Sequence, residues 1–243
     1  MDEISRNLSN IRSRIITACQ KAHRNPAEVK LLLATKTVPP IKIIKVINAG
    51  YPLIGENKVQ EIKEKFEALK AVPHQSHFIG HLQSNKIKDL LKYGVSCIQS
   101  IDRFSVAQKL QQRLTYENKT MEVLIQVNTS GEKSKFGVAP PHAAQLVQQV
   151  SSLPSLKISG LMTIGLFSVE MEKVRPCYKL LKSLQEQIEK MQIPRVSMKE
   201  LSMGMSGDLE IAIEEGATII RVGTAIFGKR NIPDSYYWNE GNA

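Results

Sequence analysis

Apolar residues recur along this chain with two kinds of spacing, helical periodicity and short continuous runs, which alternate. The first of them, Ile4, Leu8, Ile11 and Ile15, lie three or four positions apart, which predicts an amphipathic helix at the N-terminus. Beyond it, short runs rich in Val, Ile and Leu are each followed by a longer stretch with helical spacing. The pattern indicates repeated strand–helix units.

Eight short runs have the composition of buried β-strands, and seven longer stretches between them have that of helices. Because Val, Ile and Leu crowd these runs, we expect parallel strands that are covered on both faces. The predicted strands are residues 29–35, 52–55, 77–80, 96–101, 122–127, 157–163, 197–203 and 218–228. The predicted helices are residues 40–49, 58–70, 84–91, 105–117, 140–150, 172–191 and 207–215.

Eight such units are the number that closes a (β/α)8 TIM barrel. The sequence therefore predicts this α/β fold, with an extra N-terminal helix packed outside the barrel. An open doubly wound sheet is the alternative. No linker rich in Pro, Gly or Ser divides the 243 residues. We expect one domain over residues 1–243, since barrels of about 250 residues are common.

Composition favours a soluble protein of a reducing compartment. Hydrophobic residues make up 42% of the chain and charged residues 23%, which disfavours disordered and fibrous classes. We see neither an apolar run that could span a membrane nor a signal peptide. The three cysteines, Cys19, Cys97 and Cys177, lie far apart and form no pair motif. We expect a cytoplasmic protein with no membrane partner.

The formal net charge of +10 would suit a polyanion-binding protein. However, the lysines are spread along helical stretches, and aromatic residues make up only 5% of the chain. Solvated helix faces explain this distribution better than a nucleic-acid interface does. We therefore expect no nucleic-acid partner, while a small anionic ligand remains compatible with the charge.

Lys36 directly follows the first apolar strand. In a barrel, functional groups gather at the carboxyl ends of the strands. A lysine there can face a dry pocket, where desolvation lowers the pKa of the amine and leaves it nucleophilic. Such an amine can form a Schiff base with an aldehyde. The alternative is a lysine that extends into solvent.

Polar residues also follow the second, third and fifth strands, at residues 55–57, 80–86 and 128–133. Asn, Ser and Thr are common in turns and at helix N-caps, so each of these segments has an ordinary structural explanation. The segments after strands seven and eight are more informative. Ser206 and Gly207 follow strand seven, and Gly223 and Thr224 follow Arg221 in strand eight. Barrels frequently bind phosphate at these two loops.

Two further patterns do not support a site. Residues 223–230 nearly match a nucleotide-binding P-loop, but they lack the final Ser or Thr, and residues 225–227 look like a strand. His74, His77 and His81 have no carboxylate or cysteine beside them at metal-ligand spacing. We expect neither nucleotide binding nor a metal site.

The strand ends together resemble the pyridoxal phosphate homeostasis protein family, which consists of single-domain relatives of the alanine racemase N-terminal barrel. The resemblance covers residues 30 to 230, in seven ordered motifs. They are ATKT (34–37), GENKVQE (55–61), HFIGHLQSNK (77–86), NTSGEKSKFG (128–137), GLMT (160–163), LSMGMSGD (201–208) and RVGTAIFG (221–228).

The resemblance implies a fold-type III barrel that holds pyridoxal 5′-phosphate as a Schiff base on Lys36. It also implies Arg221 against the pyridine nitrogen. The phosphate would be held by Ser206 and by the backbone of Gly223 and Thr224, and Asn57 and Ser202 would line the cofactor. The chain departs from the family pattern in its compact segment 165–172 and beyond residue 230.

The family's members resemble cofactor carriers and buffers of vitamin B6 and amino-acid metabolism. We expect a non-catalytic carrier and assign no catalytic residue. The related racemase needs a second acid/base group to protonate both faces of its substrate, and this chain is too short to contain the domain that supplies it. A pyridoxal phosphate-dependent amino-acid racemase is the alternative, and a regulator that binds nucleic acid or a protein is a third. Apo forms of pyridoxal phosphate enzymes are the expected recipients, and we expect a monomer.

Overall fold

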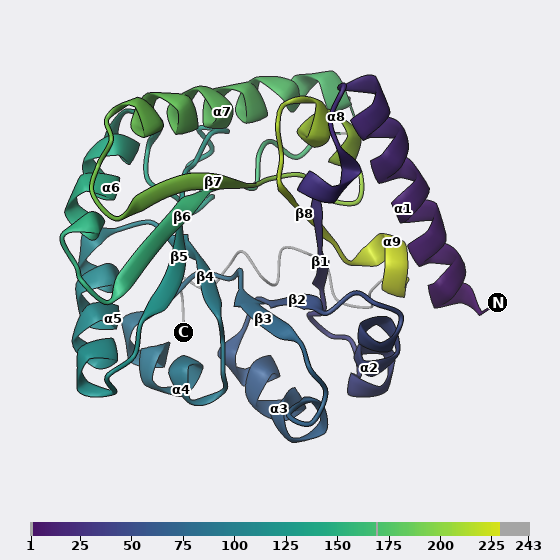
Figure 1. The fold of residues 1–243 in the computed structure, drawn as a ribbon, viewed down its shortest axis with the longest axis horizontal. Coiled ribbons are helices and arrows are strands. Elements are labelled where there is room, and N and C mark those ends of the chain that lie inside the picture. Colours follow the sequence, from purple (N-terminus) through teal and green to yellow (C-terminus); the bar gives the residue numbers. More distant parts are fainter. Residues whose placement is uncertain (1, 169, 229–243) are drawn as a thin grey trace.

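Eight parallel strands close into a barrel in the computed structural model of the protein, which describes residues 2–168 and 170–228 (Figure 1). Each strand pairs with its neighbours in sequence, and β1 pairs with β8 to complete the ring. The strands are β1 (Lys30–Ala34), β2 (Leu53–Glu56), β3 (Gln75–Phe78), β4 (Cys97–Ile101), β5 (Met121–Gln126), β6 (Leu156–Met162), β7 (Val196–Ser202) and β8 (Ile219–Val222).

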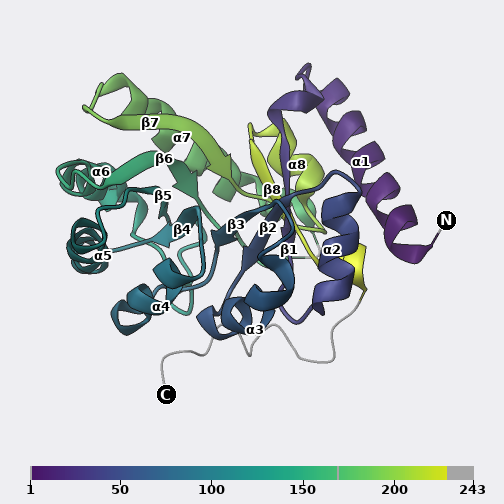
Figure 2. The ribbon, with the colours of Figure 1, turned by 60° about the horizontal axis from the view of Figure 1, so that its bottom comes forward.

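Helices surround the barrel and cover the outer faces of the strands (Figures 1 and 2). They are α1 (Glu3–Lys21), α2 (Pro40–Asn48), α3 (Val59–Leu69), α4 (Ile87–Lys92), α5 (Phe104–Tyr116), α6 (Ala143–Ser151), α7 (Arg175–Lys190), α8 (Leu209–Glu214) and α9 (Thr224–Phe227). Short 3-10 turns at Pro26–Glu28, Ser84–Lys86, Pro140–His142 and Met171–Lys173 precede β1, α4, α6 and α7.

The architecture confirms the predicted (β/α)8 barrel with an extra N-terminal helix, and the doubly wound alternative is wrong. Strands such as β2 and β4 are buried at every position, as expected for strands packed on both faces. The predicted third strand was placed two residues too late, since β3 is Gln75–Phe78. Likewise β2 extends to Glu56, which places that carboxylate in the sheet rather than in the loop after it.

The predicted last strand, residues 218–228, is wrong beyond Val222. The strand ends there, and residues 224–227 form the short helix α9. Ile226 is fully buried, α9 packs against α1, and the Asn7 side-chain amide donates to the Ile226 carbonyl at 3.1 Å. Tertiary packing thus overrides the strand preference of Ile and Phe. Lys229 and Arg230 of the P-loop-like segment lie outside the described residues.

Helix α1, at the N-terminus, packs against the last two helices of the barrel, α8 and α9. The Asp2 side chain accepts from the Ser5 backbone N–H at 3.3 Å and caps the helix. Its apolar face, including Leu8, Ile11 and Ile15, is buried, and the helix lies against α8 and α9. Residues far apart in sequence are therefore fixed beside one another at the loops that follow β7 and β8.

The described part of the chain contains no helix that is both long and apolar enough to cross a membrane.

Candidate functional site

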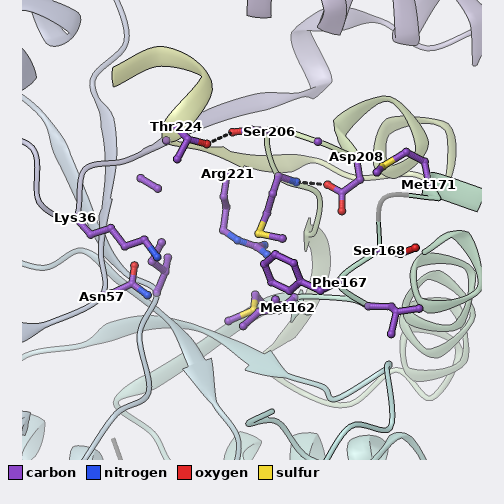
Figure 3. A pocket seen from close by; sticks show the side chains of 17 residues that line it. Lys36, Asn57, Met162, Phe167, Ser168, Met171, Ser206, Asp208, Arg221 and Thr224 are labelled. Carbon is purple, nitrogen blue, oxygen red and sulfur yellow. Dashed lines mark hydrogen bonds between the residues drawn. The ribbon is translucent and has the colours of Figure 1, made fainter. Parts of the chain in front are cut away.

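A pocket of about 240 Å³ opens at the carboxyl ends of the strands (Figure 3). It collects residues of β1, β6 and β8 and residues that follow β1, β2, β3, β6, β7 and β8. The lining residues are Ala34, Lys36, Asn57, Ile79, Met162, Ile164, Leu166, Phe167, Ser168, Met171, Met205, Ser206, Gly207, Asp208, Arg221, Gly223 and Thr224. Six of the seven predicted site residues line this pocket, and Ser202 does not.

Lys36 is the second residue after β1 and is only 8% exposed. Its side chain extends toward the centre of the pocket (Figure 3). The backbone around it is fixed on both sides, because the Thr35 N–H donates to the Gly55 carbonyl at 2.9 Å and the Val38 N–H donates to the Thr35 carbonyl at 2.9 Å. The structure therefore presents a buried lysine amine inside a cavity, rather than a lysine that extends into solvent.

The loop after β7 turns sharply at Gly204, whose φ of +90° is the left-handed conformation that glycine adopts without strain. A Cβ at this position would lie 2.4 Å from the Ala212 Cβ. Asp208 closes the loop, because its carboxylate accepts from the Met205 N–H at 2.6 Å and from the Tyr178 hydroxyl at 2.7 Å. Burial raises the pKa of Tyr178, as does the Asp208 carboxylate, so the phenol stays protonated as a donor.

Arg14 of α1 fixes the same loop from outside. Its guanidinium donates to both oxygens of Glu210, at 2.6 and 2.8 Å, and to the Ser206 carbonyl at 3.0 Å. With its carbonyl engaged there, Ser206 directs its hydroxyl toward Thr224 on the neighbouring loop, at an Oγ–Oγ1 distance of 3.4 Å. The loops after β7 and β8 therefore meet at one rim of the pocket.

This rim offers backbone donors that have no acceptor among the described residues. The backbone N–H groups of Ser206, Gly207 and Gly223 donate to no acceptor among the described residues. All three residues line the pocket. Backbone N–H groups that lack protein acceptors and converge on a cavity suit an anion such as a phosphate group. The rim thus fits the phosphate of the expected cofactor.

Arg221 of β8 lies at the floor of the pocket and is 6% exposed. Its guanidinium donates to the Ser202 hydroxyl at 2.8 Å and to the Thr163 carbonyl at 2.7 Å, and it forms no ion pair with a carboxylate of the described residues. Burial lowers its pKa, yet a guanidinium stays charged at neutral pH. A buried cation without a carboxylate partner suits a ligand that brings an acceptor atom.

A buried chain of hydrogen bonds holds Arg221 from behind. The Ser202 hydroxyl, which accepts from Arg221, donates to the Gln99 side-chain carbonyl at 2.6 Å, and the Gln99 amide lies 2.8 Å from His77 Nδ1. Because the amide donates, His77 Nδ1 carries no proton. Ser202 is not among the residues that line the pocket, and its hydroxyl contacts Arg221 and Gln99. Its predicted place beside the cofactor stays a prediction.

Asn57 lies at the edge of the pocket, at the end of β2. Gly80 permits this arrangement, since a Cβ on Gly80 would lie 1.9 Å from the Asn57 carbonyl oxygen. The segment after β3 can therefore pass directly over the Asn57 backbone. Close packing against the Asn57 backbone therefore explains why glycine stands at position 80 of the motif at residues 77–86.

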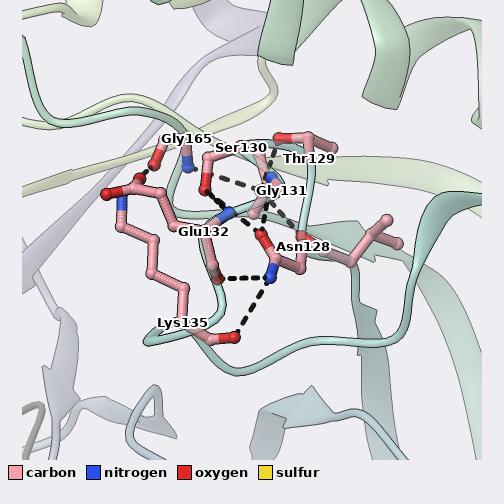
Figure 4. A network of polar contacts seen from close by, with 9 residues as sticks. Asn128, Thr129, Ser130, Gly131, Glu132, Lys135 and Gly165 are labelled. Atoms are coloured by element: carbon pink, nitrogen blue, oxygen red, sulfur yellow. Dashed lines mark hydrogen bonds and ion pairs between the residues drawn. The ribbon is translucent and has the colours of Figure 1, made fainter.

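Asn128 at the end of β5 builds a turn instead of a binding site (Figure 4). Its side-chain amide donates to the carbonyls of Glu132 and Lys135, at 2.9 and 3.1 Å, and its side-chain oxygen accepts from Ser130 and Gly131. Lys135 pairs with Glu132 and donates to the Gly165 carbonyl at 2.6 Å. The loop after β5 therefore anchors the start of the segment that follows β6.

Sequence reasoning missed several residues around the pocket. Leu166, Phe167 and Met171 form an apolar rim over it, and Phe167 is 55% exposed. Gln99 and His77 orient Arg221 from within the barrel. The available signal for Gln99 was a polar residue within a strand that is buried at every position.

The three histidines occupy separate environments. His74 Nδ1 contacts the Val72 carbonyl, His77 contacts Gln99, and the His81 ring stacks on Phe136 with ring centroids 3.7 Å apart. Residues 2–168 and 170–228 contain no cluster of three or more His, Cys, Asp or Glu side chains that could hold a metal ion. Cys19, Cys97 and Cys177 are buried free thiols, and burial raises the pKa of Cys19 and Cys97.

Comparison with known proteins agrees with this geometry. Residues 4–231 match the family described as alanine racemase, N-terminal domain. The chain is 44% identical over 223 residues to the pyridoxal phosphate homeostasis protein of Aquifex aeolicus, covering 92% of this chain and 96% of that protein.

Two solved structures are similar over most of their length. A Bifidobacterium adolescentis protein described as unknown is 38% identical with a TM-score of 0.87, covering 93% of this chain and 94% of the other. PipY of Synechococcus elongatus, solved with pyridoxal phosphate bound, is 29% identical with a TM-score of 0.81, covering 93% of this chain and all (100%) of PipY. The chain therefore belongs to the pyridoxal phosphate homeostasis protein family, built on the alanine racemase N-terminal barrel.

Proposed function

We propose that the protein binds pyridoxal 5′-phosphate in this pocket, as a Schiff base on Lys36, and acts in vitamin B6 homeostasis as a non-catalytic carrier. One observation supports this most directly. Within the described part of the chain, a buried lysine, a buried guanidinium without a carboxylate partner and a rim of backbone N–H groups without a protein acceptor line the same cavity. These are the groups that the aldehyde, the ring nitrogen and the phosphate of this cofactor require. The family membership agrees with the proposal.

Each part of the pocket has a role in the proposal. Lys36 supplies the amine, and Asn57 lies at the edge of the same cavity. The Ser206 hydroxyl and the backbone of Gly207, Gly223 and Thr224 bind the phosphate. When bound, pyridoxal phosphate supplies an aldehyde for an amine and an electron sink in its ring. Arg221, held by Ser202 and Thr163, keeps the ring nitrogen unprotonated, because a guanidinium donates a proton in a hydrogen bond but does not give it up. The ring is then a weak electron sink.

The titratable side chains favour a carrier over a racemase. Among the described residues that line the pocket, Lys36, Asp208 and Arg221 are the titratable ones. Asp208 is engaged by the Met205 N–H and the Tyr178 hydroxyl. Racemisation requires a second group that moves a proton on the opposite face of the substrate. We infer that none of these side chains is placed to do so, because Asp208 already serves the loop and Arg221 holds its protons.

Substitutions in the rim formed by the loops after β7 and β8, here called the phosphate rim, should weaken cofactor binding to different extents. Replacing Ser206 by Ala should weaken cofactor binding by about 1–2 kcal/mol, the cost of one charge-assisted hydrogen bond. Gly223→Val should weaken it more, because a branched side chain prevents the phosphate from reaching the backbone N–H groups. Equilibrium titration of each variant with pyridoxal phosphate measures both effects. Ser168→Ala, which changes a lining residue on the loop after β6, is the matched control. Normal binding by Gly223→Val would show that the loop after β8 does not hold the phosphate.

Transfer of the cofactor tests the carrier function. The loaded protein, repurified and mixed with the apo form of an unrelated pyridoxal phosphate enzyme, should restore that enzyme's activity. By itself it should racemise, decarboxylate or transaminate common amino acids no faster than free pyridoxal phosphate does. Robust turnover that survives repurification and disappears with Lys36→Ala would instead establish the racemase-type alternative.

A further inference from the structure

Behind Lys36 lies a group of charged side chains that the pocket itself does not use. Glu56 at the end of β2 and Lys65 on α3 form a buried ion pair with an O–N distance of 2.8 Å, and Lys65 lies 3.2 Å from Glu61 one helical turn away. We call these three residues the carboxylate–lysine cluster. Glu56 is 2% exposed and Lys65 is 7% exposed. None of the three lines the cofactor pocket.

The carboxylate–lysine cluster holds the main chain on both sides of Lys36. On the N-terminal side, the Thr35 hydroxyl donates to Glu56 at 2.6 Å, and the Lys65 ammonium donates to the Thr35 carbonyl at 2.8 Å. On the C-terminal side, the Thr37 N–H donates to Glu61 at 2.9 Å. Lys36 itself extends into the pocket, which none of the three residues of the cluster lines.

The backbone at Thr37 is strained. Its φ is +64°, which is rare for a β-branched residue because its Cβ is crowded in the left-handed region. Such conformations are unfavourable and persist only where surrounding contacts enforce them. Here the contacts are the hydrogen bond from the Thr37 N–H to Glu61 and the one from the Thr37 hydroxyl to the Lys36 carbonyl at 2.6 Å.

Stability alone is a poor explanation for the carboxylate–lysine cluster. A buried ion pair often stabilises a fold no better than apolar side chains of similar volume, because both charges lose their hydration. Burial raises the pKa of Glu56 to about 7, an effect that the Lys65 charge opposes and Glu61 reinforces. The carboxylate–lysine cluster instead fixes the direction of the main chain at Lys36, since its hydrogen bonds hold the residues on either side.

We propose that Glu56, Glu61 and Lys65 are positioning residues for Lys36, holding its amine where it meets the cofactor aldehyde. The proposal rests on the proposed function. In the attachment that they favour, the neutral Lys36 amine adds to the aldehyde carbon, the carbonyl oxygen leaves as water, and a carbon–nitrogen double bond remains. These residues touch neither cofactor nor pocket and act through the main chain at Thr35 and Thr37.

A comparison in two backgrounds tests this role. Glu61→Ala removes the acceptor of the Thr37 N–H at the edge of the helix, and Glu61→Gln keeps an oxygen there. With Lys36 present, Glu61→Ala should weaken pyridoxal phosphate binding about tenfold, as expected for a lost charge-assisted hydrogen bond, whereas Glu61→Gln should retain most of the affinity. In the Lys36→Ala background, Glu61→Ala should change the remaining binding by less than about twofold, because the positioned amine is absent. The readouts are the visible Schiff-base absorption and equilibrium dialysis.

A second variant tests action through the main chain. Thr37→Gly accepts a positive φ without strain, so adding it to Glu61→Ala should restore most of the lost affinity. Glu67→Ala, which removes an exposed partner of Lys70 on the same helix, is the control and should have no effect. Lys65→Met should weaken pyridoxal phosphate binding as Glu61→Ala does. If Lys65→Met fails to fold, the Glu61 and Thr37 variants still test the proposal.

The outcomes separate this proposal from the proposed function. Equal losses with and without Lys36 would mean that the carboxylate–lysine cluster only maintains the fold. Failure of Thr37→Gly to restore affinity would also count against positioning. If the unchanged protein gave no Schiff-base absorption with pyridoxal phosphate, the proposed function itself would be wrong, and the role assigned to these residues would be lost with it.

Discussion

Replacing Lys36 by alanine should abolish the covalent attachment of pyridoxal phosphate. The side chain is buried in the pocket, and loss of its amine leaves no nucleophile at the same place. The unchanged protein mixed with pyridoxal phosphate should be yellow. After reduction with borohydride, the phosphopyridoxyl group should be found on Lys36 by peptide mass analysis. Lys36→Ala should show neither the Schiff-base absorption nor the modified peptide.

Residual binding to this variant is also informative. The phosphate rim and Arg221 remain in place, so Lys36→Ala should still bind the cofactor without a covalent link and with lower affinity. Lys63→Ala, an exposed lysine on α3, should retain the full absorption and serves as the control. Finding the reduced cofactor on any other lysine would contradict the assignment.

Acid should destabilise the protein through His77. Burial lowers the pKa of His77 from 6.5 to about 4, with a further lowering by Lys30 that Glu200 opposes. The unfolded chain therefore takes up a proton between these two values and the folded chain does not, so stability is lost as the pH falls through this window. The full loss is about 3 kcal/mol, since one pKa unit corresponds to about 1.4 kcal/mol.

The structure explains why protonation of His77 is unfavourable. Its Nδ1 accepts from the Gln99 amide, which also connects to Ser202 and Arg221. A proton on Nδ1 would oppose that donor inside the barrel. His77→Gln should therefore flatten the fall in the free energy of unfolding between pH 6.5 and about 4, measured by denaturant titration. His142→Gln, on an exposed turn, should leave it unchanged. An equal fall in the His77 variant would show that other groups carry the acid sensitivity.

Much of the barrel could be read from local pattern. Parallel strands covered on both faces are mostly apolar, so short runs such as residues 29–35 and 122–127 are distinguishable from the helices between them. The order of the strands follows as well, because consecutive parallel strands joined by helices lie side by side. A pocket could be predicted as well, because the carboxyl ends of the strands meet at one end of a barrel. It would contain Lys36, Arg221 and the small residues after the last two strands.

Local pattern failed where contacts between distant segments decide the outcome. Residues 224–227 have the composition of a strand, but they form a helix because α1 packs against them. Local pattern also did not predict that the Ser202 hydroxyl contacts Gln99 and Arg221. The tilt and stagger of the strands decide which inward-facing side chains meet in a barrel. These quantities cannot be read from the sequence of a single strand.

The sequence by itself determined the number and order of the strands, the position of Lys36 at the end of the first, and the small residues that leave room for an anion. Tertiary structure alone decided which groups hold the reactive positions. Ser202 meets Gln99, and Arg221 meets the Thr163 carbonyl, because ring closure brings strands that are not neighbours to one place. The physical reason is that burying a charge or an amide requires partners in space, and those partners come from chain segments that only the closed barrel brings together.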